Sequence, residues 1–258
     1  MAEKIPTVIV TGASKGIGRA ACIKLLEAGA NVVGFARSQN ELQSLQDECA
    51  GSATKGRFVY VAGDITDRAA CSQVVEKAVS EFKSIDALVN NAAIIDPLKK
   101  LSEVSKEEMH HHLDVNLYSV LELTQLALPY LNQTHGRVIN VSSGSAINPL
   151  IAWGPYCVSK AALNMLTANI ALEEPNVTFL ALRPGVVDTE LQHIIRTSGE
   201  KNMSPKDHEK FVGLKTGSKL LSASVPGQVI CNLALRLDHS MTGKFFSWDS
   251  PELESYRS

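Results

Sequence analysis

Strand-like and helix-like segments alternate along almost the whole chain, and this alternation limits the fold more than any other feature. Short β-branched and apolar runs, typical of buried parallel strands, are separated by amphipathic helical patterns. A repeated order of strand and helix predicts a parallel sheet with helices on both faces. The predicted fold is therefore α/β, with one doubly wound parallel sheet of about seven strands in a single domain over residues 1–258. The expected strands cover residues 7–10, 31–36, 58–61, 85–89, 137–141, 177–182 and 244–248.

Composition agrees with such a domain and excludes several classes of protein. The 258 residues are 45% hydrophobic and carry a formal net charge of -2, so we expect neither a nucleic acid nor a membrane surface as the main partner. The five cysteines contain no CxxC pair, which indicates reduced thiols and no metal site. No apolar run approaches the ~18 residues of a membrane span. We therefore expect a cytoplasmic protein.

A glycine-rich turn joins the first expected strand to a helix expected over residues 16–28. The glycines follow the spacing GxxxGxG, which lets the backbone approach a phosphate while the helix directs its positive N-terminal end at that anion. A loose turn that binds nothing is the alternative, but the position between a strand and a helix favours dinucleotide binding. The residues expected to contact the dinucleotide are Gly12, Ser14, Lys15, Gly16, Ile17 and Gly18.

The end of the second expected strand indicates which dinucleotide binds. NAD enzymes commonly place Asp or Glu there, because a carboxylate accepts from the ribose 2′-OH and repels a 2′-phosphate. This chain has Arg37 instead, and Lys15 in the glycine turn adds a second cation that suits a phosphate. Two solvated surface cations are the alternative interpretation. The sequence therefore favours NADPH and NADP+ as cofactor.

A tyrosine and a lysine lie one helical turn apart near the start of a long helical pattern. Tyr156 and Lys160 share a helix face about 6 Å apart along the axis. A cation beside a phenol lowers its pKa toward neutrality, which makes a proton donor, although the same spacing also occurs on ordinary helices. Ser143 follows the fifth expected strand, at the edge where open α/β sheets bind ligands. Asn116 lies among apolar residues, where a buried amide must find a partner.

The glycine turn, Asn116, Ser143 and the pair Tyr156 and Lys160 follow one another in an order that resembles the short-chain dehydrogenase/reductase family. The resemblance covers nearly the whole chain and implies a Rossmann-like sheet. One departure is Ala93, where the family usually has glycine. The resemblance implies that Asp64 and Ile65 meet the adenine, and that Asn90, Asn91 and Ala92 meet the adenosine side of the cofactor. It places Pro184, Gly185, Val187 and Thr189 at the cofactor, with Val187 and Thr189 on the nicotinamide carboxamide. The matching segments are residues 11–18, 64–65, 90–93, 116, 143, 156–160 and 184–189.

The resemblance also implies a reaction, in which a hydride passes from NADPH to a ketone or diketone carbonyl and Tyr156 protonates the oxygen. In the family, Lys160 lowers the pKa of that tyrosine and binds the nicotinamide ribose. Ser143 orients the carbonyl, and Asn116 holds a water that leads to solvent. The residues 243–246 and the short tail are similar to the sepiapterin and benzil reductase branch.

Two other functions remain open at this point. One is an oxidative NAD(P)-dependent alcohol or hydroxysteroid dehydrogenase, and the other is a non-catalytic NADPH-binding regulator. The resemblance further implies a homo-oligomer, either a dimer or a tetramer.

Three further segments carry expectations. Residues 191–218 are polar and broken by glycines, so we expect an irregular lid over the substrate. Residues 110–112 are three consecutive histidines, which point in different directions on a helix and are interpreted as solvated. Trp153, near Tyr156, borders the expected substrate pocket and favours a planar small-molecule carbonyl substrate.

Overall fold

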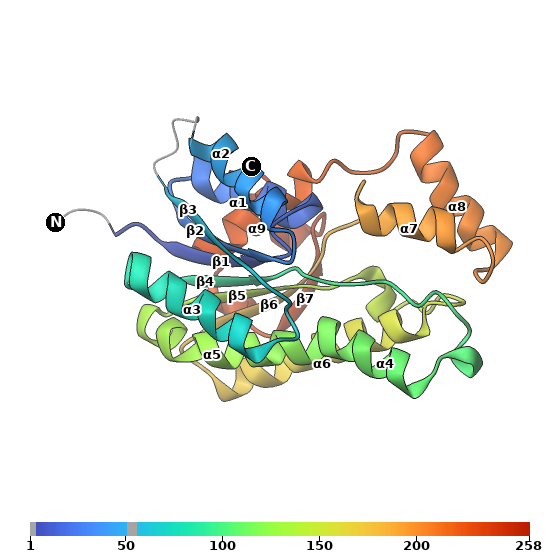
Figure 1. Cartoon of the computed structure of the whole chain (residues 1–258), viewed down its shortest axis with the longest axis horizontal. Helices are drawn as coiled ribbons and strands as arrows, with labels where there is room; N and C mark the ends of the chain where they lie inside the picture. The colour runs from blue at the N-terminus through green and yellow to red at the C-terminus, as the bar shows by residue number, and fades with distance from the viewer. Residues whose placement is uncertain (1–3, 51–55) are drawn as a thin grey trace.

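The computed structural model describes residues 4–50 and 56–258, which form one seven-stranded parallel sheet (Figure 1). The strand order is β3-β2-β1-β4-β5-β6-β7, so the predicted α/β fold is confirmed, while residues 1–3 and 51–55 of the predicted domain lie outside the described part. The order reverses between β1 and β4, which is where open α/β sheets bind ligands. The strands are β1 (Thr7–Thr11), β2 (Asn31–Ala36), β3 (Phe58–Ala62), β4 (Ala87–Asn90), β5 (Arg137–Val141), β6 (Thr178–Arg183) and β7 (Lys244–Ser247).

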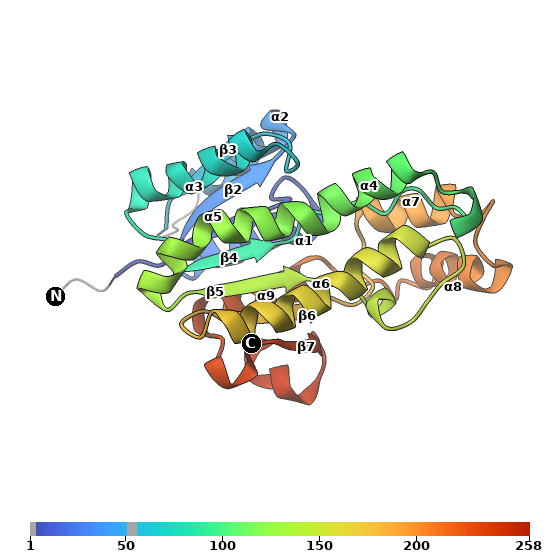
Figure 2. The ribbon, with the colours of Figure 1, turned by 90° about the horizontal axis from the view of Figure 1, so that it is seen from below.

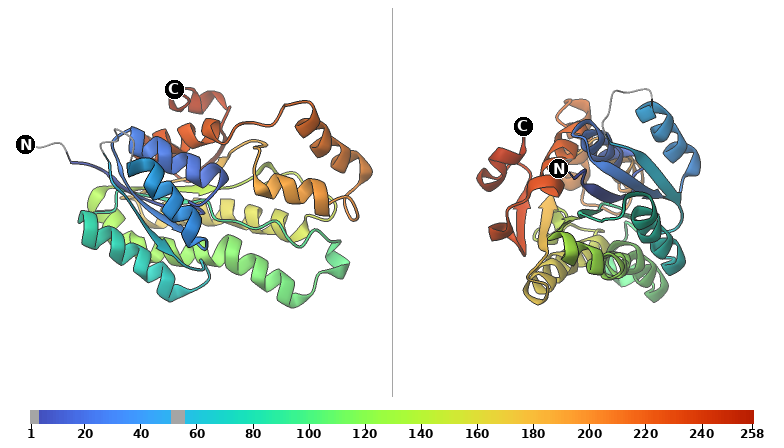
Figure 3. Two further views of the ribbon diagram at one scale, coloured as in Figure 1. Left: turned by 45° about the horizontal axis from the view of Figure 1, so that its top comes forward. Right: turned by 90° about the vertical axis from the view of Figure 1, so that its left-hand side faces the viewer.

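Helices cover both faces of the sheet, as Figures 1 and 3 show. Helices α1, α2 and α9 lie on one face, and α3, α5 and α6 lie on the other. Within the described ranges, no helix combines the length and apolar character needed to cross a membrane. The helices are α1 (Gly16–Glu27), α2 (Gln39–Ala50), α3 (Arg68–Phe82), α4 (Lys106–Leu113), α5 (Ser119–Thr134), α6 (Gly154–Glu173), α7 (Glu190–Ser198), α8 (Pro205–Thr216) and α9 (Ser224–Arg236).

The strands separate two hydrophobic cores because successive side chains of a strand point to opposite faces. In β1, Val8 and Val10 pack with α1, α2 and α9, whereas Ile9 packs with α3 and α5. All three side chains are fully buried. Burial on both faces explains why these strands appear in the sequence as continuous apolar runs.

The segment predicted as irregular over residues 191–218 is instead mostly helical. It forms α7 and α8, and Figure 2 shows both helices beyond the carboxyl ends of the strands. Three of the expected breakers mark helix boundaries: Gly199 and Gly217 follow the two helices, and Pro205 lies in the first turn of α8 after its cap, Ser204. The fourth, Gly213, lies inside α8 and does not break it. The prediction was wrong because polar residues and glycines dominate the segment, although Leu191, Ile194 and Ile195 in α7 do have helical spacing.

Candidate active site

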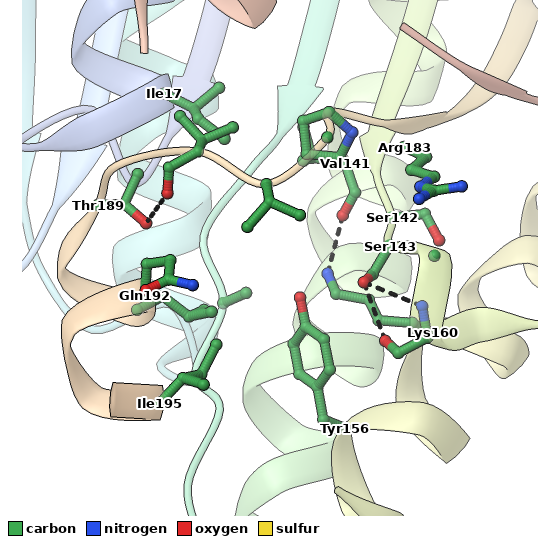
Figure 4. A pocket seen from close by; sticks show the side chains of 18 of the residues that line it. Ile17, Val141, Ser142, Ser143, Tyr156, Lys160, Arg183, Thr189, Gln192 and Ile195 are labelled. Carbon is green, nitrogen blue, oxygen red and sulfur yellow. Dashed lines mark hydrogen bonds between the residues drawn. The ribbon is translucent and has the colours of Figure 1, made fainter. Parts of the chain in front are cut away.

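A cavity of about 590 Å³ opens at the carboxyl ends of the strands, between the sheet and helices α6, α7 and α8. Many residues predicted from the sequence line it, and Figure 4 shows several of them facing one another. Ser14, Gly18, Arg37, Asp64, Ile65, Asn90 and Asn116 do not line this cavity. The predicted residues that do are Gly12, Lys15, Gly16, Ile17, Asn91, Ala92, Ser143, Tyr156, Lys160, Pro184, Gly185, Val187 and Thr189.

The glycine turn has the conformation that its sequence demands. Gly12 and Gly16 have φ values of +65° and +54°, which glycine adopts without strain. Gly18 lets α1 approach the turn, because a Cβ there would lie 2.3 Å from the Gly12 carbonyl oxygen. This bare backbone at the start of α1 forms a cradle that fits a phosphate group of a dinucleotide.

The turn is fixed to the neighbouring strand by Thr11 and Asn91. The Thr11 hydroxyl accepts hydrogen bonds from the backbone N–H groups of Asn91 at 2.9 Å and Ala92 at 3.0 Å. The Asn91 amide donates back to the Thr11 carbonyl at 2.9 Å. The ends of β1 and β4 are therefore held together directly beneath the cradle.

Tyr156 lies at the first turns of α6, with its hydroxyl directed into the cavity (Figure 4). Burial raises the pKa of Tyr156 to about 12, and its hydrogen bond with Ser143 lowers that pKa by less. The expected lowering of the tyrosine pKa is therefore wrong for this structure, because desolvation of the phenol outweighs the effect of its neighbours. The phenol remains protonated throughout the neutral range.

Lys160 is only 3% exposed, and its Nζ donates to the Val141 carbonyl at 2.8 Å. Burial lowers the pKa of Lys160 to about 8. The ammonium lies 5.7 Å from the centre of the Tyr156 ring, so the expected pairing of the two residues on one helix face is present. A lysine with this pKa changes charge close to physiological pH.

Ser143 begins the short helical turn Gly144–Ala146 after β5. Its Oγ accepts from the backbone N–H of Ser145 at 3.2 Å and from the Ser145 hydroxyl at 2.9 Å (Figure 4). The Ser143 hydroxyl proton is therefore not used by Ser145 and can be directed toward Tyr156 and the cavity. Sequence reasoning missed Ser145, whose only signal was a second serine close to the first.

Asn116 lies in a π-helical turn, Asp114–Tyr118, between α4 and α5, a feature common at functional sites. Its Oδ1 accepts from the Ile94 N–H and its Nδ2 donates to the Ile94 carbonyl, both at 2.9 Å. The same Nδ2 lies 2.8 Å from His112 Nε2. The Asn116 side chain therefore positions the segment after β4 behind Tyr156.

His112 corrects the expectation of three solvated histidines. His110 and His111 are exposed, but His112 is fully buried, with Nδ1 2.7 Å from the Asp96 carbonyl. Burial lowers the pKa of His112, so the neutral ring donates from Nδ1 and accepts at Nε2 from Asn116. His112 lies on the inner face of α4, which explains why it is buried while His110 and His111 are exposed.

The Asn90 side chain is buried and forms hydrogen bonds within the core. Its Nδ2 donates to Asn140 Oδ1 at 2.8 Å, and Asn140 Nδ2 donates to the Thr167 hydroxyl at 2.9 Å. These buried polar groups join β4, β5 and α6. Asn90, Asn91 and Ala92 stay predicted contacts of the adenosine side, and Asn90 could contribute only through its backbone because its side chain is used in the core.

Arg37, Asp64 and Ile65, which are expected at the adenosine end of the cofactor, lie outside the cavity, whereas Lys15 lines it. Arg37 is exposed directly after β2, and Lys15 Nζ lies 3.8 Å from Glu41 Oε1 in an exposed ion pair. Hydrogen bonds from Thr66 lower the pKa of Asp64, with a smaller contribution from the charge of Arg37. The N-cap of α3 is Asp67, so Asp64 does not cap that helix.

The side of the cavity that faces away from the glycine turn is formed by aromatic and apolar side chains. Trp153 and Phe211 stack with ring centres 5.3 Å apart, and Trp153 meets Tyr156 edge to face at 5.8 Å. Leu150 and Ile195 add apolar surface, and Gln192 contributes an amide. Phe211 and Gln192 were missed in the sequence because they lie in the segment where no helices were expected.

Comparison with known proteins agrees with this geometry. The short chain dehydrogenase family model matches residues 6–199. A benzil reductase, (S)-benzoin forming, of Saccharomyces cerevisiae is 36% identical over 258 residues, covering 95% of this chain and 97% of that protein. A sepiapterin reductase of Meriones unguiculatus is 33% identical over 238 residues, covering 87% and 89%. A crystal structure of a Saccharomyces cerevisiae short chain dehydrogenase/reductase superposes with a TM-score of 0.94 at 35% identity, covering 98% and 100%. The chain therefore belongs to the short chain dehydrogenase family and groups with its benzil and sepiapterin reductases.

Proposed function

We propose that this oxidoreductase uses NADPH to reduce a ketone or diketone carbonyl to an alcohol, with Tyr156 as the proton donor. The observation that carries the proposal is the buried Tyr156 hydroxyl, which faces the cavity beside Ser143 and Lys160 (Figure 4). When bound, the reduced nicotinamide supplies a hydride to the carbonyl carbon. The similarity to benzil and sepiapterin reductases supports the same reaction class.

The raised pKa of Tyr156 keeps the phenol in the protonated form that a proton donor needs at neutral pH. A carbonyl oxygen that gains negative charge becomes a strong base, and a phenol with a pKa of about 12 retains its proton until that charge develops. The free hydroxyl proton of Ser143 orients the carbonyl, and the charge of Lys160 stabilises negative charge at the same place.

The preference for NADPH rests on the end of β2. Arg37 follows that strand directly, where a carboxylate would bind a ribose 2′-OH, and Lys15 lies on the glycine turn. Both cations are exposed, so their side chains can move to meet a 2′-phosphate. The expected contact residues Asp64 and Ile65 follow β3, the strand next to β2.

NADPH oxidation at 340 nm, measured against a panel of diketones, quinones and pterins and repeated with NADH, tests the proposal. We expect turnover of planar diketones with NADPH and much weaker turnover with NADH. Tight NADPH binding without turnover on the whole panel would favour the non-catalytic regulator. Faster alcohol oxidation than carbonyl reduction at neutral pH would favour the oxidative dehydrogenase.

We also propose that the protein is cytoplasmic and forms a homodimer or homotetramer. Helix α6 supports self-association because Val158, Met165 and Leu172, seven residues apart, are 44%, 63% and 83% exposed. Exposed apolar residues at this spacing lie on one side of a helix. Sedimentation or light scattering that gives the mass of a single chain at micromolar concentration would refute the oligomer.

A further inference from the structure

Gln192 on α7 is a buried amide that points into the cavity with half of its hydrogen-bonding capacity unused. The side chain is 2% exposed, and its Nε2 has no hydrogen-bond partner among the described residues. Leaving such a donor unpaired costs free energy. A buried unpaired donor in the wall of a binding cavity therefore indicates a ligand with a matching acceptor.

The orientation of the amide follows from its other contact. Arg196 Nη1 donates to Gln192 Oε1, and a guanidinium group has no acceptor atom. The oxygen of Gln192 must therefore face Arg196, which leaves the Nε2 donor facing away. Figure 4 shows Gln192 across the cavity from Tyr156 and Ser143, with its amide nitrogen directed into the space between them.

The wall around Gln192 is suited to a flat, apolar ligand. Trp153 and Phe211 stack close to Tyr156, and Trp153 Nε1 is a second buried donor without a partner among the described residues. Donors therefore stand on both sides of the place where a substrate must lie. A ligand with one carbonyl oxygen can accept hydrogen bonds from the donors on only one of these sides.

We propose that Gln192 is a specificity-determining residue that donates a hydrogen bond to a second carbonyl oxygen, which selects aryl 1,2-dicarbonyl compounds over monoketones. This inference rests on the proposed reductase function and names its substrate class. One oxygen of the substrate faces Tyr156 and Ser143, and the other accepts from Gln192 Nε2. Vicinal diketones suit this arrangement because the two carbonyl groups are skewed about the bond that joins them.

The test compares benzil with deoxybenzoin, which replaces one of the two carbonyl groups by CH₂ and keeps both phenyl rings. In Gln192→Met, we expect kcat/KM for benzil to fall about tenfold, mainly through KM, which matches the loss of one neutral hydrogen bond. Deoxybenzoin should stay within twofold, and the Kd of NADPH should also stay within twofold. His193→Met, an exposed position on the same helix, is the control and should change neither substrate.

Gln192→Glu guards against a folding defect in the methionine variant. It can keep the contact with Arg196 but places an acceptor where the donor was, so benzil should lose at least as much as in Gln192→Met. Equal losses for benzil and deoxybenzoin, or a weaker NADPH complex with no loss specific to benzil, would overturn the contact with a second carbonyl.

Failure of the proposed function is distinguishable from failure of this contact. If the natural protein reduces neither compound and no other member of the panel of diketones, quinones and pterins, the reductase proposal fails, and benzil binding to the NADP+-loaded protein then decides the contact. Binding about tenfold weaker in Gln192→Met than in His193→Met would support the contact. Equal binding in the two variants would refute it.

Discussion

The two sides of the cavity are built differently. On the sheet side, the glycine turn and the ends of β1 and β4 are joined by three part-buried hydrogen bonds that converge on the side chains of Thr11 and Asn91. On the lid side, α7 and α8 are held by side chains: Asn202 Nδ2 donates to the Leu98 carbonyl at 2.7 Å, and Lys215 Nζ pairs with Asp188 at 2.6 Å in an exposed ion pair. Several hydrogen bonds converge on two residues of the sheet side, whereas the two lid contacts are separate and one of them is exposed, so we expect substitutions to reshape the lid side more readily than the sheet side.

The largest effect that this difference predicts is at the sheet side. Tyr156→Phe should lower kcat by about 10²- to 10⁴-fold, because it removes the proton donor, while the Kd of NADPH stays within twofold. Stopped-flow reduction and fluorescence titration measure the two quantities. Tyr118→Phe, which alters an exposed tyrosine, is the control, and near-parental turnover in Tyr156→Phe would remove the tyrosine from the mechanism.

Two glycine substitutions compare the two sides in terms of stability. Gly18→Ala places a methyl group 2.3 Å from the Gly12 carbonyl oxygen, so the turn or α1 must shift, at a cost of about 1–3 kcal/mol. Gly213→Ala in α8 meets nothing within 4 Å and should stabilise the helix by about 0.5–1 kcal/mol. Urea unfolding measures both, and equal effects would mean that the two sides do not differ as described.

Phe211→Ala separates substrate binding from cofactor binding. Loss of the stack on Trp153 should loosen the lid side and raise KM for an aromatic diketone about tenfold or more. The Kd of NADPH should not change, because the glycine turn is distant from this contact. Equal weakening of substrate and cofactor would show that the two sides act as one unit.

The smallest effect is a pH dependence that belongs to the sheet side. The pKa of Lys160 is lowered to about 8, so its charge is present below that pH and is lost as the pH rises through it. Reductive kcat/KM should therefore fall about fourfold between neutrality and pH 8.5. Because the pKa of Tyr156 is raised to about 12, its ionisation should cause no further change in kcat/KM over this pH range. In Phe211→Ala, kcat/KM should fall at the same pH as in the natural protein. A fall at a different pH would show that the lid affects the pKa of Lys160.

The sequence predicted the sheet side well because its signals are local. Gly12, Gly16 and the strand before them carry their own conformational requirements, and the one-turn spacing of Tyr156 and Lys160 fixes their common face. The parallel direction of the strands was predicted from the alternation of strand-like and helix-like segments alone. None of these depends on which distant segment packs against them.

The remaining features depend on tertiary packing. His112 differs from His110 and His111 only by its direction on α4, and Asn90 differs from Asn91 only by the face of the sheet that it occupies. The raised pKa of Tyr156 results from burial that many segments create together. No sequence motif marks Gln192, because its proposed role depends on the hydrogen bond from Arg196 that fixes the orientation of its amide.

The buried ammonium of Lys160 sets stability against activity within a single residue. Because its pKa is lower in the folded chain than in the unfolded one, the folded state binds its proton less readily, and this lysine weakens the fold as the pH falls from about 10 toward neutrality. Selection for heat resistance alone would replace it with an apolar side chain of similar length. The proposed role of Lys160 at the reacting carbonyl would therefore come at a cost that the thermodynamics of folding can measure.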